Sequence, residues 1–378
     1  MSSPKRSPDS RTYPEWTDLP IELSAVVANR LTSIHDYVSF RGVCKLWRLA
    51  ATFDNFDRGF PRVPWLMYVT KEERTKKGFF GPHIPRVANF LDVSMNKTYR
   101  SINFPPTCGR RYLSCNGWIL NVSGVDVELT HPVWRIRIEL PGLNPFSVNR
   151  HGNCASTVII SKMVLSSSPT LKTDLVVMVI WGSDNQLGFC RPGDSSWTIM
   201  ASWNDSFSDI IYHNGRLYAL DDSRRVVECD IHGANPTEIR QVFELPSFDP
   251  NLNLAVTGRQ KLYLVETSGK FLIISRRFNL FKTLSFKVFE FDLMDGSHNE
   301  VHDLGNKALF LGFNSSFSLE LSDWNEVKPN CIYFTDHLGL YKDRDVSVYC
   351  LLDASINSFV HGITRATCAP ATWVVPSL

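Results

Sequence analysis

Long apolar runs are missing from this 378-residue sequence. A membrane-spanning helix needs about 20 consecutive apolar residues, whereas the longest candidate, LVVMVIW at residues 175–181, has the length of a strand. The opening residues, MSSPKRSPDSRTYPEW, also lack the apolar region of a secretory signal. We therefore expect no membrane partner and no secretion. Their Ser, Pro and charged residues predict a disordered tail over residues 1–12.

Cysteine pairs of the kind that bind zinc are absent. None of the nine cysteines belongs to a Cys-x-x-Cys motif, so we expect no structural zinc site and no other bound metal. An odd number of cysteines without a secretory signal favours reduced, mostly buried thiols. These features predict a location in the nucleus, the cytoplasm or both.

A large excess of charge of either sign is absent too, because the net charge is +2. Recognition of nucleic acid normally requires a clustered basic face. The basic pairs in SRRF (275–278) and DSRRVV (222–227) are isolated in the sequence, which is typical of solvated surface. We therefore expect no nucleic acid partner.

Motifs for catalysis or cofactor binding are also missing. The chain has no glycine-rich phosphate loop and no Gly-x-Ser-x-Gly elbow. His298 and His302 are four residues apart, but Asn299 stands where a zinc protease needs Glu, and both follow a predicted turn, DLMDGS. Carboxylates are scattered, and LDDS at 220–223 is typical of a hairpin turn. The sequence predicts no catalytic residue and no cofactor.

Short strands dominate the chain from about residue 65. Segments such as DLVVMVIWG, RLYAL and KVFEFDL are bounded by Gly, Asn, Asp or Pro, and no amphipathic helix of normal length interrupts them. Residues 117–141 and 215–246 share a pattern of three predicted strands separated by turns, and both end in ELP. Repeats of about 45–50 residues are typical of propeller blades, so we predict a mainly β, kelch-like β-propeller of about six blades over residues 65–378. A pair of β-sandwiches is the alternative.

Helices are predicted only within residues 13–52. Pro20 favours the first turn of a helix whose apolar residues Leu23, Val26, Val27 and Leu31 form one stripe. Ser33 with Asp36 resembles a capping pair for a second helix, and Val43, Leu46, Trp47 and Ala50 repeat at helical spacing. Three short helices bury little surface on their own, so this region docks on the rest of the chain or on a partner. Residues 53–64 are expected to be a linker.

The helical region resembles an F-box. Residues 19–51, LPIELSAVVANRLTSIHDYVSFRGVCKLWRLAA, contain in order Leu-Pro-x-Glu-Leu, Arg-Leu, an Asp and Arg-x-Val-Cys-x-x-Trp-Arg. The matching residues are Leu19, Pro20, Glu22, Leu23, Arg30, Leu31, Asp36, Arg41, Val43, Cys44, Trp47 and Arg48.

The rest of the chain is similar to plant F-box proteins with a KIB-type β-propeller. The phrases SSWTIM, DIIYHNGRLYAL, LFLGFNSSFSL, KPNCIYFTDH and PATWVVPSL carry this likeness by their order. The resemblance implies a non-catalytic substrate-recognition subunit of an SCF-type E3 ubiquitin ligase. It implies a Skp-type adaptor and, through it, cullin and RING proteins as partners, with an unknown protein substrate on the propeller. The implied adaptor-binding residues are Leu19, Pro20, Leu23, Val27, Leu31, Val43 and Trp47, and no substrate-binding residue is assigned.

Two positions depart from the F-box pattern. Ser24 and Ala28 stand where long aliphatic residues are usual. Losing three buried carbons at one site corresponds to about 2 kcal/mol, so we expect weaker adaptor binding than is typical of the family. In the propeller, THPVWR (130–135) replaces the family's Asn-Pro-x-Thr-Gly turn. Trp47 has two interpretations, packing inside the helical module or contact with the adaptor, whereas Cys44 is expected to pack internally.

Two other functions stay open. In the first alternative, the propeller is a protein-binding or inhibitory module that acts without ligase assembly. The small residues Ser24 and Ala28 motivate this alternative. Alternatively, the chain is an enzyme on a propeller scaffold, which converging carboxylates at one mouth of the propeller would identify.

Overall fold

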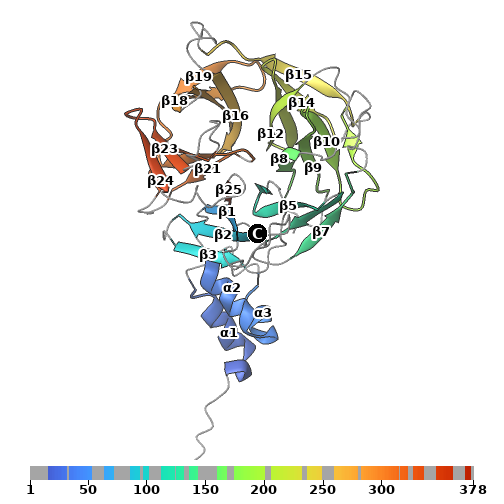
Figure 1. Ribbon diagram of the computed structural model, residues 1–378, viewed down its shortest axis with the longest axis vertical. Coiled ribbons are helices and arrows are strands. Elements are labelled where there is room, and N and C mark those ends of the chain that lie inside the picture. Colours follow the sequence, from blue (N-terminus) through green and yellow to red (C-terminus); the bar gives the residue numbers. More distant parts are fainter. Residues whose placement is uncertain are drawn as a thin grey trace, which may run out of the picture. The chain divides into compact units, whose positions relative to one another are not determined.

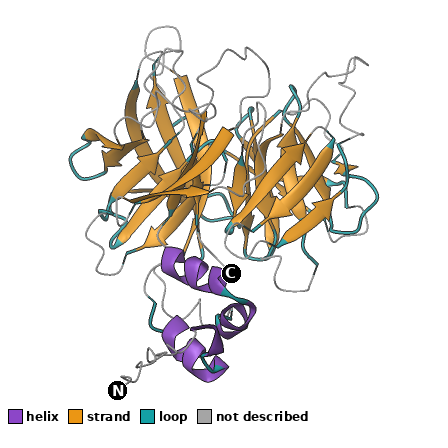
Figure 2. Cartoon of the chain, turned by 60° about the horizontal axis from the view of Figure 1, so that its bottom comes forward, coloured by secondary structure: helices purple, strands orange, loops and turns teal. Residues whose placement is uncertain are grey.

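The computed structural model describes residues 16–31, 34–52, 64–71, 86–93, 97–101, 112–123, 125–131, 136–143, 160–167, 174–200, 206–231, 236–248, 259–279, 282–314, 316–321, 327–335, 346–360 and 371–375. The chain divides into two compact units, one of residues 1–62 with residue 378 and one of residues 63–377. Among the described residues, the helices belong to the first unit and the strands to the second (Figure 2). The predicted tail, residues 53–63 of the predicted linker and Ser33 lie outside the described residues.

The first unit is a small helical module. Its elements are the 3-10 helix η1 (Trp16–Asp18) and the helices α1 (Ile21–Ala28), α2 (Ile34–Val43) and α3 (Lys45–Ala50). Pro20 precedes α1 with an extended backbone, so it lies one position before the predicted first turn. Among its described residues, the buried side chains are few and mostly small: Ser24, Ala28, Tyr37, Phe40, Ala50 and Ala51. The described part of the module therefore has little core of its own.

The second unit consists of six antiparallel or mixed sheets arranged as the blades of a propeller (Figure 1). Blade I contains β1 (Trp65–Lys71), β2 (Arg86–Asp92), β3 (Lys97–Ser101) and β25 (Thr372–Val374). Blade II contains β4 (Leu113–Cys115), β5 (Trp118–Ser123), β6 (Asp126–Thr130) and β7 (Arg137–Leu140). Blade III contains β8 (Ile160–Leu165), β9 (Val177–Trp181), β10 (Gln186–Cys190) and β11 (Thr198–Ile199).

The remaining three blades follow in chain order. Blade IV contains β12 (Phe207–His213), β13 (Arg216–Asp221), β14 (Arg225–Cys229) and β15 (Ile239–Glu244). Blade V contains β16 (Arg259–Thr267), β17 (Lys270–Phe278), β18 (Thr283–Phe291) and β19 (His298–Val301). Blade VI contains β20 (Lys307–Leu311), β21 (Phe317–Glu320), β22 (Cys331–Phe334), β23 (Val346–Cys350) and β24 (Ile356–Val360). This arrangement confirms the predicted fold class and six blades, and it excludes the β-sandwich alternative.

The predicted strand repeats correspond to real strands. Residues 117–141 cover β5, β6 and β7, and residues 215–246 cover β13, β14 and β15. Each ELP ending follows the outer strand of its blade. The Pro141 carbonyl accepts a hydrogen bond from Trp197 Nε1 at 2.7 Å, and the Pro246 carbonyl accepts one from Arg224. In both repeats, the shared ELP ending therefore marks the end of a blade.

The ring is closed by the C-terminal strand. β25 pairs with β1 of the same blade, with Leu66 opposite Trp373. Trp373 is fully buried, and its Nε1 donates to the Leu311 carbonyl of blade VI at 3.1 Å. Thr372 Oγ1 donates to the Tyr112 carbonyl, just before blade II, at 3.0 Å. One short strand thus joins blade I to both of its neighbours.

Blade VI departs from the pattern of the other blades. Its strand order is β21-β20-β22-β23-β24, and β20 and β22 run parallel. The chain enters this blade at its second strand, turns inward to β21 and then returns to β22. Gly312 lies in the inward turn, where an added Cβ would stand 3.0 Å from Thr335 Oγ1 and 3.6 Å from Trp373. A larger residue at this position would require Thr335 to shift, and the turn brings Asn314 to the centre of the ring.

Aromatic side chains fill the spaces between blades. Phe248 stacks on Phe289 at 4.2 Å between blades IV and V, and Phe286 lies 5.1 Å from Phe334 between blades V and VI. His213, at the end of β12, is buried with its ring 5.5 Å from Phe271 of blade V. Aromatic pairs of this kind contribute about 0.5–1.5 kcal/mol beyond their burial. Packing between blades therefore accounts for part of the aromatic content of the sequence, which is 12%.

Candidate functional surfaces

Helix α1 turns its larger aliphatic side chains outward. Leu23, Val26 and Val27 are exposed, Leu23 to 53%, whereas Ser24 and Ala28 are 0% exposed. Residues 24 and 28 are one helical turn apart, so they form one face, and this face points into the module. A helix of a globular protein normally turns its large apolar residues toward the core. The reverse arrangement leaves an apolar surface of the kind that partners cover.

Ser24 and Ala28 therefore lie away from the exposed face. The sequence predicted weaker adaptor binding because these two side chains are small. Both are buried inside the module, so the reason given for weaker binding, a loss of apolar contact with the adaptor at these two positions, does not hold. α1 contacts α3, and side chains of this size allow the two helices to approach closely.

The other predicted adaptor-binding residues differ in exposure. Pro20 and Val43 are exposed, while Leu19 and Leu31 are half-buried. Pro20 and Val43, together with Leu23 and Val27, therefore remain candidates for contact with a partner.

Trp47 packs within the module while part of its surface stays accessible. Its ring stacks on Phe40 with centroids 4.3 Å apart, and its Nε1 donates to the Trp16 carbonyl at 3.2 Å. Its backbone N–H donates to Sγ of Cys44, which caps the start of α3, at 3.5 Å. Cys44 thus packs internally in the structure, and Trp47 has a clear structural role.

The two arginines of the Arg-x-Val-Cys-x-x-Trp-Arg motif also serve the module itself. Arg41 donates to the Ala51 carbonyl, and Arg48 Nε donates to the Arg41 carbonyl at 3.3 Å. The buried Tyr37 hydroxyl donates to the Thr52 carbonyl at 2.6 Å, and burial raises the pKa of Tyr37 to about 12. Within this motif, Val43 and Leu46 are the exposed apolar side chains.

The sequence prediction missed several exposed apolar residues. Leu46 and Leu49 of α3 are exposed, as are Ile21 and Val26 of α1, and Trp16 is 74% exposed. Val26 and Leu46 already belong to the helical stripes of the sequence, and Leu49 follows Leu46 at the same spacing of three residues. We call the following seven exposed side chains the aliphatic set: Ile21, Leu23, Val26, Val27, Val43, Leu46 and Leu49.

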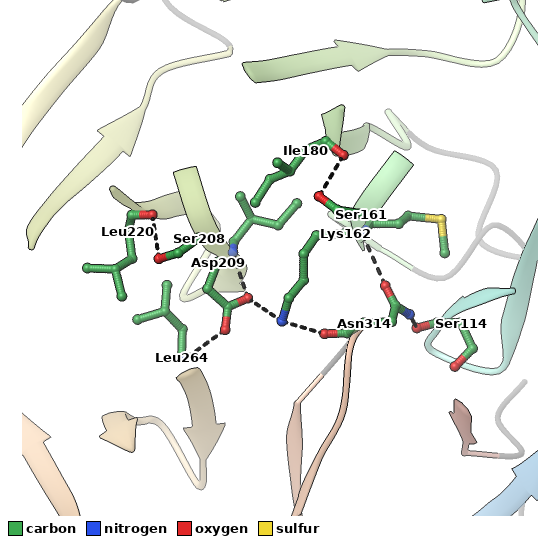
Figure 3. Close-up of polar contacts among 11 residues, drawn as sticks. Ser114, Ser161, Lys162, Ile180, Ser208, Asp209, Leu220, Leu264 and Asn314 are labelled. Atoms are coloured by element: carbon green, nitrogen blue, oxygen red, sulfur yellow. Dashed lines mark hydrogen bonds and ion pairs between the residues drawn. The ribbon is translucent and has the colours of Figure 1, made fainter. Parts of the chain in front are cut away.

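A buried ion pair occupies the centre of the propeller (Figure 3). Lys162 of β8 places Nζ 2.9 Å from Oδ1 of Asp209 of β12, and both side chains are nearly inaccessible. Asp209 Oδ2 accepts the backbone N–H of Leu264, in β16, at 3.0 Å. Its Oδ1 also accepts the N–H of Ile210 at 2.8 Å. The carboxylate is thus held by blades III, IV and V.

Asn314 connects this ion pair to the remaining blades (Figure 3). Its backbone carbonyl accepts from Lys162 Nζ at 2.6 Å, and its Oδ1 accepts the Met163 N–H at 3.1 Å. Its Nδ2 donates to the Ser114 carbonyl of blade II, and Ser114 Oγ donates to the Trp373 carbonyl of blade I. One hydrogen-bonded network therefore reaches all six blades.

The network crosses the axis of the propeller. In a ring of six, blades III and VI are opposite each other, and Asn314 of blade VI binds Lys162 and Met163 of blade III. Side chains therefore span the centre at this level. Asp209 is held there by one ammonium group and two backbone N–H groups. Asp209, Asn314 and Trp373 lie in three of the sequence phrases quoted above, but no sequence signal places them in one network.

The described residues offer no group of His, Cys, Asp and Glu side chains arranged for a metal ion. His298 lies in strand β19 and stacks on Phe291 at 4.8 Å, so the two histidines of HNEVHD do not share a helical face. Four of the cysteines in the described part are buried: Cys115, Cys190, Cys229 and Cys331. Burial raises the pKa of Cys115 to about 11, which makes its thiol unreactive. No helix in the described part is both long and apolar enough to cross a membrane.

Fold and surface together define a class of protein: a six-bladed propeller with a short helical module whose large aliphatic residues face outward. Residues 90–350 match the KIB1-4 beta-propeller family, and the chain belongs to this family. F-box protein At2g26160 of Arabidopsis thaliana is 27% identical, over 86% of this chain and 96% of that protein. F-box protein SKIP23 of the same plant is 22% identical, over 89% of each chain. These relatives confirm the resemblance to plant F-box proteins with a KIB-type propeller.

Solved structures show a more distant likeness. TolB from Acinetobacter baumannii gives a TM-score of 0.44 at 10% identity, with 87% of this chain and 73% of that chain covered. A likeness this distant carries no argument about function.

Proposed function

We propose that the chain is the substrate-recognition subunit of an SCF-type E3 ubiquitin ligase. The helical module binds a Skp-type adaptor, which joins it to cullin and RING proteins, and the propeller binds a protein substrate for ubiquitination. The chain itself performs no chemistry. It raises the effective concentration of the substrate beside the ubiquitin-conjugating enzyme. The names of its relatives support the F-box part of this proposal.

The reversed face of α1 is the observation that carries the proposal. Fully burying a Val, Leu or Ile side chain contributes about 1.5–3 kcal/mol. The aliphatic set holds seven such side chains on a module with very little core. Association costs about 4–15 kcal/mol in lost translational and rotational freedom. Burying even part of the aliphatic set against a partner offsets a substantial share of this cost. A protein partner with an apolar groove fits these side chains.

Co-purification with a Skp-type adaptor tests the proposal. The Leu23→Asp, Val27→Asp double variant places two charges in the interface, so we expect it to lose the adaptor while the wild type retains it. Both side chains are exposed, so the variant should fold normally by circular dichroism. Leu352→Asp, Ile356→Asp is the matched control, because these residues are exposed on blade VI. Failure of the wild type to bind the adaptor refutes the proposal.

The argument for the alternative, a module that acts without ligase assembly, no longer holds. It depended on the small side chains at Ser24 and Ala28, and both are buried away from the exposed face. The proposal includes a nuclear or cytoplasmic location, which imaging of a fluorescent fusion protein tests.

A further inference from the structure

Two basic segments of blade V lie side by side at one end of the blade. The antiparallel register of β16 and β17 sets Lys261 opposite Arg276, and Arg277 lies opposite Gln260. Arg259 begins β16 at this end, and Lys282 lies in the turn that joins β17 to β18. SRRF, which looked isolated in the sequence, is therefore part of a cluster. We call Arg259, Lys261, Arg277 and Lys282 the basic end of blade V.

One arginine of the second basic pair, Arg224 of DSRRVV, contacts the basic end of blade V. Arg224 lies in the turn between β13 and β14 of blade IV. Its Nη1 donates to Oε1 of Gln260 at 3.3 Å, and Gln260 Nε2 donates to Ser275 Oγ at 2.7 Å. Arg225, by contrast, forms an ion pair with Asp221 at 2.7 Å. Arg224 thus reaches the basic end from blade IV, where the exposed Asp222 and Glu244 lie at the same end of the sheet.

Strands β16 to β18 of blade V separate their charges by end, whereas the outer strand β19 carries Glu300 opposite Phe289 and is followed by Asp303. Residues 259–265 and 273–289 contain six Lys or Arg and no Asp or Glu. The opposite end, around the β16–β17 and β18–β19 turns, carries Glu266, Glu290, Asp292 and Asp295 with Lys270. Gathering like charges raises the free energy of a fold. An anionic ligand offsets this cost by pairing with the gathered cations.

Aromatic rings position the cations. Lys261 Nζ lies 4.9 Å from the centre of the Tyr263 ring and 5.2 Å from that of Phe313. Arg276 is buried, with its guanidinium 4.8 Å from the Phe334 ring and Nη1 donating to Tyr263 OH at 3.2 Å. Arg259 and Lys282 are exposed and Arg277 is half-buried. A buried charge below exposed ones strengthens the field that a ligand meets.

We infer that the basic end of blade V binds an acidic segment of the protein substrate, through carboxylate or phosphoryl groups. This inference rests on the proposed function, in which the propeller holds the substrate. Neighbouring strands are about 4.8 Å apart, so β16 to β18 span about 10 Å, the length of about three residues of an extended peptide. Guanidinium groups match both kinds of anion by paired hydrogen bonds.

A long polyanion fits this surface less well than a short acidic segment. The same end of blade IV carries Asp222 and Glu244, both exposed, besides the paired Asp221. A nucleic acid that extends beyond blade V toward blade IV meets these carboxylates and is repelled.

Fluorescence anisotropy with the full chain tests the inference. The probe is a fluorescein-labelled dodecapeptide of alternating Glu and Gly, and a second peptide carries phosphoserine in place of Glu. We expect at least one peptide to bind, and the tighter one identifies carboxylate or phosphoryl groups as the preferred anion. Arg259→Ala, Lys282→Ala should weaken binding about three- to tenfold. Raising the salt concentration should weaken it further.

The matched control is Arg216→Ala, Lys270→Ala, which removes the same charge from exposed residues at the opposite end of blades IV and V. We expect this variant to bind like the wild type. Equal weakening in both variants, or no binding of either peptide by the wild type, overturns the inference. Tighter binding of a dodecathymidylate probe also overturns it, in favour of nucleic acid. Adaptor co-purification measured on the same samples tests the proposed function separately, because the two surfaces share no residue.

Discussion

Replacing Lys162 by Met tests whether the central network holds the propeller together. The change removes the ammonium group that lies 2.9 Å from Asp209 Oδ1 and 2.6 Å from the Asn314 carbonyl. Asp209 keeps two backbone N–H groups as donors, but its charge is then buried without a counter-ion. Breaking a buried ion pair in this way costs about 3–5 kcal/mol. The free energy of unfolding, measured by urea titration with tryptophan fluorescence, should fall by that amount.

A double-mutant cycle separates the ion pair from general damage to the core. Asp209→Asn alone leaves the ammonium unpaired, so we expect a similar loss. Lys162→Met with Asp209→Asn leaves no buried charge, so the double variant should lose less than the sum of the single ones, by about 0.5–3 kcal/mol. Lys270→Met is the matched control: its ion pair with Glu290 at 2.8 Å is exposed, so the loss should be at most about 1 kcal/mol. Equal losses for Lys162→Met and Lys270→Met would refute the reasoning.

Three further predictions concern closure, pH and the helical module. Trp373→Ala should lower the free energy of unfolding by about 3–5 kcal/mol, whereas Trp16→Ala, at an exposed site, should change it by about 0.5 kcal/mol or less. Burial lowers the pKa of His213 below its ordinary 6.5. The contribution of neutral His213 to the free energy of unfolding is therefore fully present above pH 6.5. It is lost as the pH falls from 6.5 toward the lower pKa of the folded state. His213→Phe should flatten this part of the profile of urea midpoint against pH. Ser24→Leu should destabilise the module by about 1–3 kcal/mol in thermal unfolding, whereas Leu23→Ser should leave stability unchanged and weaken adaptor binding.

The sequence was enough to predict the blades because their signals are local. Strands such as β13 and β14 are bounded by turn residues, and the endings at Pro141 and Pro246 mark where blades finish. Blade VI was harder, because its chain enters at the second strand and turns inward before continuing. The parallel pair β20 and β22 has no short-range signature in the sequence.

The central network is absent from the prediction because it depends on long-range contacts. Lys162 and Asn314 are 152 residues apart, and a lone Lys in a strand normally suggests solvent. Ser24 and Ala28 of α1 were misassigned for a different reason. The spacing in α1 identified the stripe of Leu23 and Val27, but spacing does not say which side of a short helix meets the core. Burial of Ser24 and Ala28 answers that question.

Isothermal titration of the full chain with a purified Skp-type adaptor tests the central claim most directly. The account predicts saturable one-to-one binding with a negative change in heat capacity, because the aliphatic set leaves water when the adaptor binds. It also predicts that Leu23→Asp, Val27→Asp abolishes the heat signal. Absence of binding by the folded wild-type chain, or binding that this variant leaves intact, would contradict the claim.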